Sequence, residues 1–297
     1  MIHITYKCQF CNGSLVLTGD TCWDKPGLSI GRCTVCQLVQ VSDFSHVDKE
    51  HYASDDYLPA DLESARRREW RWNRRRVTRL RELIPDAHKK RALDFGCGHG
   101  GFLEQAQGLF ESLVGYDLSK RVCEEHGARG WACVSSVEEV PGEIEIILLF
   151  HVLEHLPKPW ELLTQLQEYF PGLETIVIEV PNTDEALNSV FKNEAYRKNH
   201  YSADHVYYFT SETLRRIVEF ASLEVVMDSQ LQRYTLANNL GWLNNARGGG
   251  QDLWPFLNDE KLNEHYERVL TSQKVADSVF FVCRRSDFAR PSRKPKD

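Results

Sequence analysis

The 297-residue sequence has no run of about eighteen consecutive apolar residues, the length that a membrane-spanning helix requires. It also lacks an initial basic segment followed by an apolar one, which is the pattern of a secretory signal. We therefore expect a cytoplasmic protein with no membrane partner. Without an export signal, its nine cysteines predict free thiols or metal ligands and argue against a disulfide framework.

An excess of positive charge is also missing, because the net charge of the whole chain is −7. The exception is a short segment between Arg66 and Arg91, where twelve Lys and Arg residues accompany only three acidic ones. This distribution argues against a general nucleic-acid binder, but it allows one anionic partner at the basic segment.

Nine arginines lie within residues 66–81, a stretch without glycine or proline that predicts a helix. Two interpretations of this helix stay open. It is either a solvated helix packed on the rest of the protein, or a helix whose arginines bind phosphates of a nucleotide-linked or nucleic-acid substrate. Four apolar residues at helical spacing are expected to form its buried stripe: Trp70, Val77, Leu80 and Ile84.

Residues 88–285 alternate short β-rich runs with amphipathic stretches, which predicts a doubly wound parallel sheet with helices on both faces. In such a sheet, ligands bind outside the carboxyl ends of the strands. A capping-box pattern also predicts a helix at Thr210–Ala221. The expected strands are Arg91–Phe95, Ser112–Tyr116, Trp131–Val134, Ile144–Phe150, Thr175–Val180, Glu224–Gln230 and Val275–Arg284.

The composition predicts four regions along the chain. A cysteine-rich module is expected over residues 1–50, and a linker with the arginine-rich helix over 51–87. The α/β domain is expected over 88–285, with an insertion at 234–274 that serves as a lid or a homodimer contact. The polar tail at 286–297 is expected to be disordered.

The first expected strand leads into a glycine-rich loop, LDFGCGHGG, at residues 93–101. Glycines allow the backbone to turn sharply beside a ligand, and the helix that follows offers free N–H groups. The loop also satisfies the dinucleotide pattern G-x-G-x-x-G. Taken alone, it therefore leaves two alternatives open, a dinucleotide-binding loop and a turn that binds nothing. Asp94 favours a cationic ligand with an amino-acid moiety over a pyrophosphate. Asp117 ends the second strand, where it can accept hydrogen bonds from ribose hydroxyls.

The segments LDFGCGHG and VGYD resemble the first two motifs of the class I S-adenosylmethionine (SAM) dependent methyltransferases. HVLEHLPKP, VPN and DHVYYFTSETL resemble later segments of a VLEH-type subfamily that methylates sugars and other small molecules. The resemblance covers residues 90 to 230 and implies a Rossmann-like sheet with SAM as cofactor. Ser135 and Ser136 stand where the family commonly has an acidic residue. The implied SAM-binding residues are Asp94, Gly96, Gly98, Gly100, Asp117, Leu118, Ser135, Ser136, Phe150 and His151.

Two C-x-x-C pairs, Cys8/Cys11 and Cys33/Cys36, are separated by 21 residues. Four thiolates at this spacing can converge tetrahedrally on one zinc ion, which we expect to be structural because so short a segment buries little core. The alternative is a module of reduced, unligated cysteines. The region resembles a zinc-ribbon-like module that precedes some sugar and secondary-metabolite methyltransferases. That resemblance implies three further residues near the substrate: His51, Tyr52 and Tyr57.

Methyl transfer to a hydroxyl mainly requires alignment of the acceptor and removal of its proton, for which histidine is the usual base near neutral pH. We predict His205 as this base, oriented by Asp204 or another acidic residue, and His151 as a second catalytic candidate. His155 is expected to pack in or cap its turn, and any of the three can instead be purely structural. The predicted substrate contacts are Glu154, Asn182, Tyr201, Tyr207 and Tyr208.

These observations predict a SAM-dependent methyltransferase that O-methylates a sugar, a nucleotide sugar, a glycan precursor or a related secondary metabolite. One alternative is an RNA methyltransferase that uses the zinc module and the arginine-rich helix to bind its substrate. Another is a non-catalytic SAM-binding scaffold.

Overall fold

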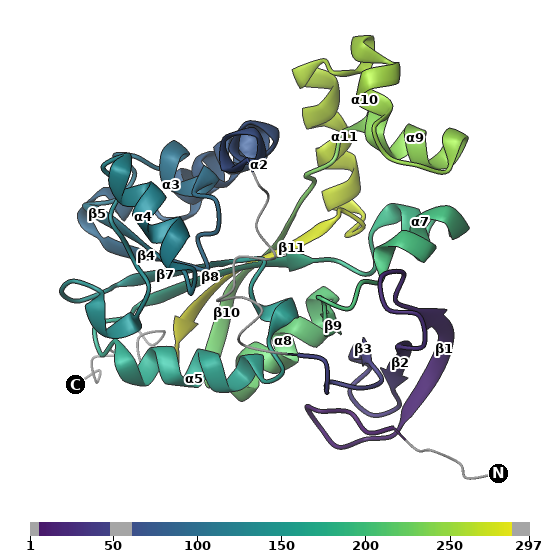
Figure 1. Cartoon of the computed structure of the whole chain (residues 1–297), viewed down its shortest axis with the longest axis horizontal. Helices are drawn as coiled ribbons and strands as arrows, with labels where there is room; N and C mark the ends of the chain where they lie inside the picture. The colour runs from purple at the N-terminus through teal and green to yellow at the C-terminus, as the bar shows by residue number, and fades with distance from the viewer. Residues whose placement is uncertain (1–5, 48–60, 287–297) are drawn as a thin grey trace, which may run out of the picture.

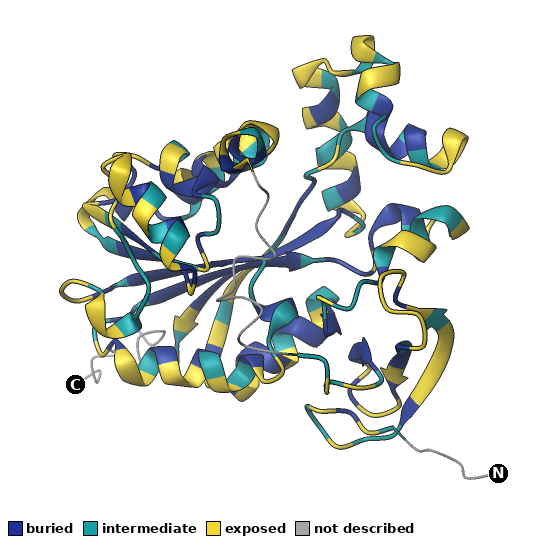
Figure 2. Ribbon diagram, viewed as in Figure 1, coloured by how far each residue is buried: buried dark blue, intermediate teal, exposed yellow. Residues whose placement is uncertain are grey.

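The computed structural model describes residues 6–47 and 61–286, which form two β-sheets with helices packed around the larger one (Figure 1). Within these residues, no helix combines the length and the apolarity needed to cross a membrane. Buried strands form the middle of the molecule, while the helices around them present an exposed outer side (Figure 2).

The larger sheet has seven strands in the order β10-β11-β8-β7-β4-β5-β6. All seven expected strands form, and their ends differ from the expected ones by at most three residues. The observed strands are β4 (Arg91–Phe95), β5 (Ser112–Tyr116), β6 (Cys133–Val134), β7 (Ile146–Phe150), β8 (Thr175–Pro181), β10 (Leu223–Leu231) and β11 (Ser278–Arg285).

The sheet is mixed, so the prediction of a parallel sheet is wrong at β11. This strand lies between β10 and β8 and runs antiparallel to both, whereas the pairs along β8-β7-β4-β5-β6 are parallel. The physical reason is the insertion between β10 and β11. The chain leaves the sheet and re-enters it at the same edge, without a helix crossing the face, and therefore returns in the opposite direction.

Helices cover both faces of the sheet, as a Rossmann-like α/β fold requires (Figure 1). The helix predicted at Thr210–Ala221 forms as α8, with the expected capping box between Thr210 and Thr213. One face carries α2 (Leu62–Leu83), α3 (Gly101–Gln105) and α4 (Lys120–Ala128), and the other carries α5 (Pro159–Tyr169) and α8 (Ser211–Phe220). Short helical turns are η1 (Ala87–Lys89), η2 (Val137–Glu139), η3 (Leu153–His155), α6 (Ala186–Ser189) and α7 (Glu194–His200).

The arginine-rich segment forms α2, and its buried side differs in part from the expected stripe. Val77, Leu80 and Ile84 are buried as predicted, but Trp70 is 46% exposed. The inner face of the helix instead continues through polar residues, because Asn73 and Arg76 are buried at helical spacing from Leu80. Trp70 falls beside this series and lies against the guanidinium of Arg74.

The cysteine-rich region forms the smaller sheet, in the order β1-β2-β3-β9. Its first three strands are β1 (Leu15–Thr21), β2 (Ser29–Cys33) and β3 (Val39–Val41). The fourth, β9 (Tyr207–Tyr208), comes from a distant part of the chain and pairs antiparallel with β3. The module is therefore joined to the α/β part by backbone hydrogen bonds, while the predicted domain boundaries stay predictions.

The insertion between β10 and β11 is helical, with α9 (Leu236–Asn245), α10 (Gly250–Leu253), η4 (Pro255–Leu257) and α11 (Glu260–Ser272). Gly250 is buried, and a Cβ on it would lie 1.8 Å from the carbonyl oxygen of Ala237. Glycine is therefore needed there so that α10 can approach α9 closely. The predicted role of the insertion, as a lid or a dimer contact, stays a prediction.

Candidate functional site

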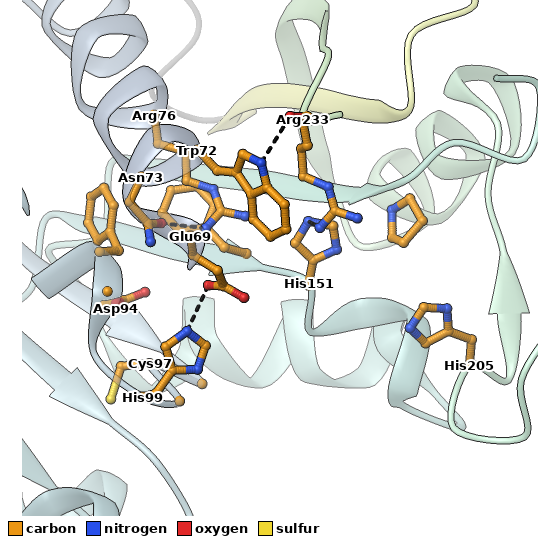
Figure 3. A pocket seen from close by; sticks show the side chains of 16 residues that line it. Glu69, Trp72, Asn73, Arg76, Asp94, Cys97, His99, His151, His205 and Arg233 are labelled. Carbon is orange, nitrogen blue, oxygen red and sulfur yellow. Dashed lines mark hydrogen bonds and ion pairs between the residues drawn. The ribbon is translucent and has the colours of Figure 1, made fainter. Parts of the chain in front are cut away.

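A pocket of about 300 Å³ opens at the carboxyl ends of β4, β7 and β8. This is the position expected for a ligand in a doubly wound sheet. Six of the residues predicted from the sequence line the pocket: Asp94, Gly96, Gly98, Phe150, His151 and His205. The arginine-rich helix α2 supplies a wall that the sequence did not predict, made of Glu69, Trp72, Asn73 and Arg76 (Figure 3).

The glycine loop after β4 lies with its backbone exposed to the pocket. Gly98 has a φ of 51°, a left-handed conformation that favours glycine, and its N–H donates to Asp117 Oδ2 at 2.9 Å. A Cβ at Gly98 would meet no atom within 4 Å. The backbone of the loop therefore borders open space that a ligand can occupy.

Asp94 lies beneath this loop and is 2% exposed. Burial raises its pKa to about 7, against a smaller lowering by the charge of Arg76. Its Oδ2 atom has no hydrogen-bond partner in the described parts of the chain. A buried carboxylate without a donor is costly unless a ligand supplies one, so the position suits a cationic or amino group.

Several predicted cofactor residues lie outside the lining of the pocket. Gly100 packs against His126, and Leu118 is 43% exposed. Ser135 is partly buried, and the hydroxyl of Ser136 donates to Glu138. Their predicted contacts with a cofactor stay predictions, as does the ribose contact of Asp117.

His151 is the centre of a buried polar network at the end of β7. Its Nδ1 atom lies 3.0 Å from Glu154 Oε1, and its Nε2 atom lies 3.0 Å from Glu179 Oε1. The guanidinium of Arg233 is 2.8 Å from the same Nε2 atom. A single nitrogen cannot both donate to Glu179 and accept from Arg233. With a proton on Nδ1 directed to Glu154, Nε2 accepts from Arg233.

Arg76 of α2 completes this network by a bidentate ion pair with Glu179, at 2.7 and 3.0 Å. Burial alone would raise the pKa of Glu179, but the charge of Arg76 and the hydrogen bonds from its guanidinium hold it well below its usual range. Glu179 and Arg76 were both missed from the sequence. A signal existed for Glu179, because it is a lone acidic residue inside the apolar strand TIVIEVP.

The inner arginines of α2 are engaged within the protein. Arg66 donates to the carbonyl of His99 at 2.9 Å, and Arg75 forms a 2.9 Å ion pair with Glu267. At the same wall of the pocket, Glu69 lies 2.8 Å from the imidazole of His99 (Figure 3). Burial would raise the pKa of Glu69, but that contact together with nearby arginine charges lowers it.

Arg233 forms the wall opposite the glycine loop and was also missed from the sequence. Its guanidinium lies over the ring of Trp72, 5.0 Å from the centroid, and Trp72 Nε1 donates to the carbonyl of Arg233. The backbone N–H of Arg233 donates to Asp277. The contact between α2 and the start of the insertion therefore closes this side of the pocket.

His205 lies at the edge of the pocket on the far side of His151 from Asp94 (Figure 3). Its ring is 4.7 Å from that of His155, at nearly a right angle. Burial, with a smaller effect of the neighbouring histidines, lowers the pKa of His205 to about 3. Asp204 is exposed, and its backbone carbonyl accepts from Nδ1 of His155 at 2.9 Å.

The other predicted substrate contacts lie inside the protein. Glu154 and Asn182 are almost completely buried, and the side-chain amide of Asn182 donates to the carbonyl of Ala276. Tyr201, Tyr207 and Tyr208 are buried between the cysteine module and the sheet. The hydroxyls of the last two donate to backbone carbonyls. Contact of these residues with a substrate stays a prediction, and His51, Tyr52 and Tyr57 lie outside the described residues.

The four cysteines of the C-x-x-C pairs converge, with all their sulfur atoms within 4.8 Å of one another. Cys8 and Cys36 are 3.6 Å apart at sulfur, and Cys11 and Cys33 are 3.4 Å apart. Zn–S bonds of about 2.3 Å place tetrahedral thiolates roughly 3.8 Å apart. The residues therefore fit a zinc ion.

The cysteine module fixes the backbone that precedes β9. The N–H of Val41 donates to the carbonyl of Val206, and the N–H of Trp23 donates to the carbonyl of Tyr201. The imidazole of His46 contacts the carbonyl of Ala203 at 2.8 Å. These contacts lie on both sides of His205 in the sequence, so the module determines where this histidine lies relative to the pocket.

Comparison with known proteins relates this chain to a known family. Residues 63–227, more than half of the chain, match a family described as a methyltransferase domain. A ubiquinone biosynthesis O-methyltransferase from Burkholderia ambifaria is 34% identical, over 27% of this chain and 44% of its own length. The chain thus spans less than half the length of this curated relative.

Solved structures with a similar arrangement include a SAM-dependent methyltransferase from Archaeoglobus fulgidus and magnesium protoporphyrin IX methyltransferase from Synechocystis with bound SAH. The first is 18% identical, covers 72% of this chain and 94% of its own, and has a TM-score of 0.44. The second is 11% identical, covers 78% and 91%, and has a TM-score of 0.46. The fold of this chain is therefore assigned from its own strand order and not from these two structures.

Proposed function

This chain belongs to the methyltransferase domain family and is a SAM-dependent methyltransferase, and from that premise we propose that it methylates a hydroxyl group of a small molecule. One observation supports the proposal most strongly. A single pocket at the carboxyl ends of the strands contains both the buried carboxylate of Asp94 beside the glycine loop and the imidazole of His151. A donor side and an acceptor side are thus available within one cavity.

The donor side fits SAM. Asp94 has a buried oxygen atom without a partner among the described residues, and the space beside Gly98 is open. When bound, SAM supplies a methyl group on a positively charged sulfur. Asp94 and the loop at Gly96 and Gly98 would hold its amino-acid part, and Asp117 would hold the ribose. Phe150 would pack against it from the end of β7.

On the acceptor side we propose His151 as the group that takes the proton of the acceptor hydroxyl. Its imidazole is oriented through Nδ1 by Glu154, as a base needs to be, and its Nε2 faces the pocket. This nitrogen is in contact with Arg233, which the acceptor would displace. His205 lies farther along the same edge and would contact the acceptor.

The acceptor class is a small molecule with a free hydroxyl. The O-methyltransferase activity named for the Burkholderia relative supports an oxygen acceptor, although it belongs to a protein that this chain matches only in part. Sugars, nucleotide sugars and glycan precursors are the acceptors that we propose to try first. An RNA acceptor is less supported, because Arg66, Arg75 and Arg76 of α2 are engaged within the protein.

The test is transfer of labelled methyl from SAM to a metabolite extract of host cells, with and without nuclease treatment. The proposal expects nuclease-resistant label in small molecules. The labelled methyl group should be in an ether linkage and not in an ester or an amine. Label confined to nuclease-sensitive polymer would overturn the small-molecule acceptor. Absence of SAM binding in a parallel calorimetric titration would overturn the donor site itself.

A further inference from the structure

A second group of metal-ligating side chains lies beside the glycine loop, apart from the four cysteines of the N-terminal module. It contains Cys97 of the loop, His126 of α4 and Cys133 of β6, whose ligand atoms all lie within 4.8 Å of one another. The sulfur atoms of Cys97 and Cys133 are 3.7 Å apart. Two thiolates on one tetrahedral zinc ion lie roughly 3.8 Å apart, so this pair already has the spacing that a shared ion requires.

The imidazole of His126 is buried with one of its two nitrogens unused. Its Nε2 atom lies 2.9 Å from the carbonyl oxygen of Gly98, and because a carbonyl only accepts, Nε2 is the protonated nitrogen. The lone pair is therefore on Nδ1, which has no hydrogen-bond partner among residues 6–47 and 61–286, although the residue is 0% exposed. A buried acceptor without a donor is costly. Histidines that bind a metal commonly donate their other ring N–H to a backbone carbonyl, as His126 does to Gly98.

A third thiol, that of Cys123, is close enough to complete the group. Cys123 lies three residues before His126 on α4, and therefore on the same side of the helix. Its sulfur atom is 2.7 Å from that of Cys133. A shift of about 1 Å would bring these two sulfurs to the spacing of zinc-bound thiolates. Both residues are half-buried, so the shift leaves the core of the sheet in place.

A disulfide between Cys123 and Cys133 is the competing use of the same thiols. It would account for the short distance between their sulfur atoms. It would leave the unpartnered Nδ1 of His126 and the convergence of Cys97 on Cys133 without a reason. A metal ion accounts for both of these features, and it can reach the group because Cys97 lines the pocket.

We propose that one thiophilic divalent ion, such as Zn²⁺, is bound by four side chains: Cys97, Cys123, His126 and Cys133. Three thiolates and one imidazole form a closed set of the kind that zinc uses in structural sites. The ion would fix the glycine loop at two points, directly through Cys97 and through the hydrogen bond of His126 to Gly98. The metal site stands on its own geometry, while its effect on SAM binding rests on the proposed function.

The test is a count of bound zinc in the full-length, reduced protein after equilibrium dialysis against micromolar free Zn²⁺, measured by atomic spectrometry. C97A and C133A are each expected to hold one ion fewer per chain than the wild-type protein. H126Q is expected to lose the same ion, because it keeps a donor for the carbonyl of Gly98 but lacks the free ring nitrogen. C283A is the matched control and is expected to hold as many ions as wild type, because Cys283 is a cysteine of the same sheet outside this group.

Each sample is also titrated with SAM, so that the two proposals can fail separately. Loss of the ion in C133A is expected to weaken SAM binding by about fivefold or more, with no change in C283A. A wild-type protein that binds SAM but holds no more zinc than C97A and C133A would overturn the metal site and leave the methyltransferase proposal intact.

The mass of each protein after removal of the reductant identifies the competing disulfide. A loss of two hydrogen atoms in wild type but not in C133A, with equal zinc in both, would assign the thiols to a disulfide and overturn the metal site. If C97A does not fold, C133A decides alone, because Cys133 is half-buried in the edge strand β6.

Discussion

At the scale of single residues, the carboxylates buried around the pocket differ in whether a cationic partner neutralises them. Glu179 is compensated by its bidentate ion pair with Arg76, so its role is to fix α2 relative to β8. Asp94 is buried without an equivalent partner, and its pKa is raised as a result. This difference separates a structural carboxylate from one that awaits a ligand.

The affinity for SAM is expected to rise with pH, because a cationic ligand binds the ionised form of Asp94. Burial raises the pKa of Asp94 from 3.8 to about 7 in the ligand-free protein. The dissociation constant should therefore fall as the pH increases from about 6 to 8, and the D94N variant should lose this dependence. Calorimetric titration at several pH values measures it, and an equally steep dependence in D94N would refute the assignment.

The same carboxylate predicts an effect on the stability of the ligand-free protein. Because the folded state binds this proton more tightly than the unfolded chain, the contribution of Asp94 to stability falls as the pH rises from about 4 through about 7. Urea unfolding of wild type and D94N across this range should converge at low pH and diverge, in favour of D94N, at high pH. The opposite order at high pH would contradict the raised pKa.

Removal of Arg76 should destabilise the protein strongly. The R76L variant leaves Glu179 buried without its cationic partner, a change that typically costs about 3–5 kcal/mol. R67A is the control, because it breaks an exposed pair with Glu63 on the same helix, and its loss should be much smaller. Urea unfolding compares them, and losses of equal size would show that the buried pair has no special role.

At the scale of elements, the sequence predicts what is local and misses what depends on long-range pairing. The strands, the glycine loop, the capping box of α8 and the cysteine pairs follow from residues close together in the chain. The pair of Arg76 with Glu179 joins residues 103 positions apart, and although Glu179 stands out in its apolar strand, nothing local identifies Arg76 as its partner. The reversed direction of β11 likewise depends on where the insertion returns to the sheet.

The cysteine module is the element whose role is clearest from its contacts. It supplies the strand that pairs with β9, and its backbone hydrogen bonds fix the chain on either side of His205. Its described part, residues 6–47, is short, so a zinc ion on the four cysteines would provide much of its stability. Loss of that ion should therefore affect the acceptor side of the pocket and spare the donor side.

This expectation can be tested with C36S, which removes one zinc ligand. We expect methyl transfer to fall by at least about tenfold, while the affinity for SAM stays within about threefold of wild type. C22S is the matched control, because Cys22 is also a buried cysteine of the module but does not belong to the cluster. Equal losses of transfer in C22S and C36S would contradict a specific role for the four-cysteine site.

At the scale of the whole molecule, several distant segments meet at one edge of the sheet. The glycine loop and α2 form one side of the pocket, and the start of the insertion and the loop before β9 form the other. Figure 1 shows the cysteine module and the helical insertion on opposite sides of this edge. The central claim of this account is that the pocket binds SAM against the glycine loop.

The most direct test of this claim compares SAM binding by G98A and G108A in calorimetric titrations. Both glycines have positive φ angles, and an added Cβ would meet no atom within 4 Å at either one, so the backbone penalty is matched. Only Gly98 lines the pocket. We predict that G98A binds SAM about tenfold or more weakly and that G108A binds it like wild type. Equal affinities in the two variants, or a wild-type protein that does not bind SAM, would contradict the account.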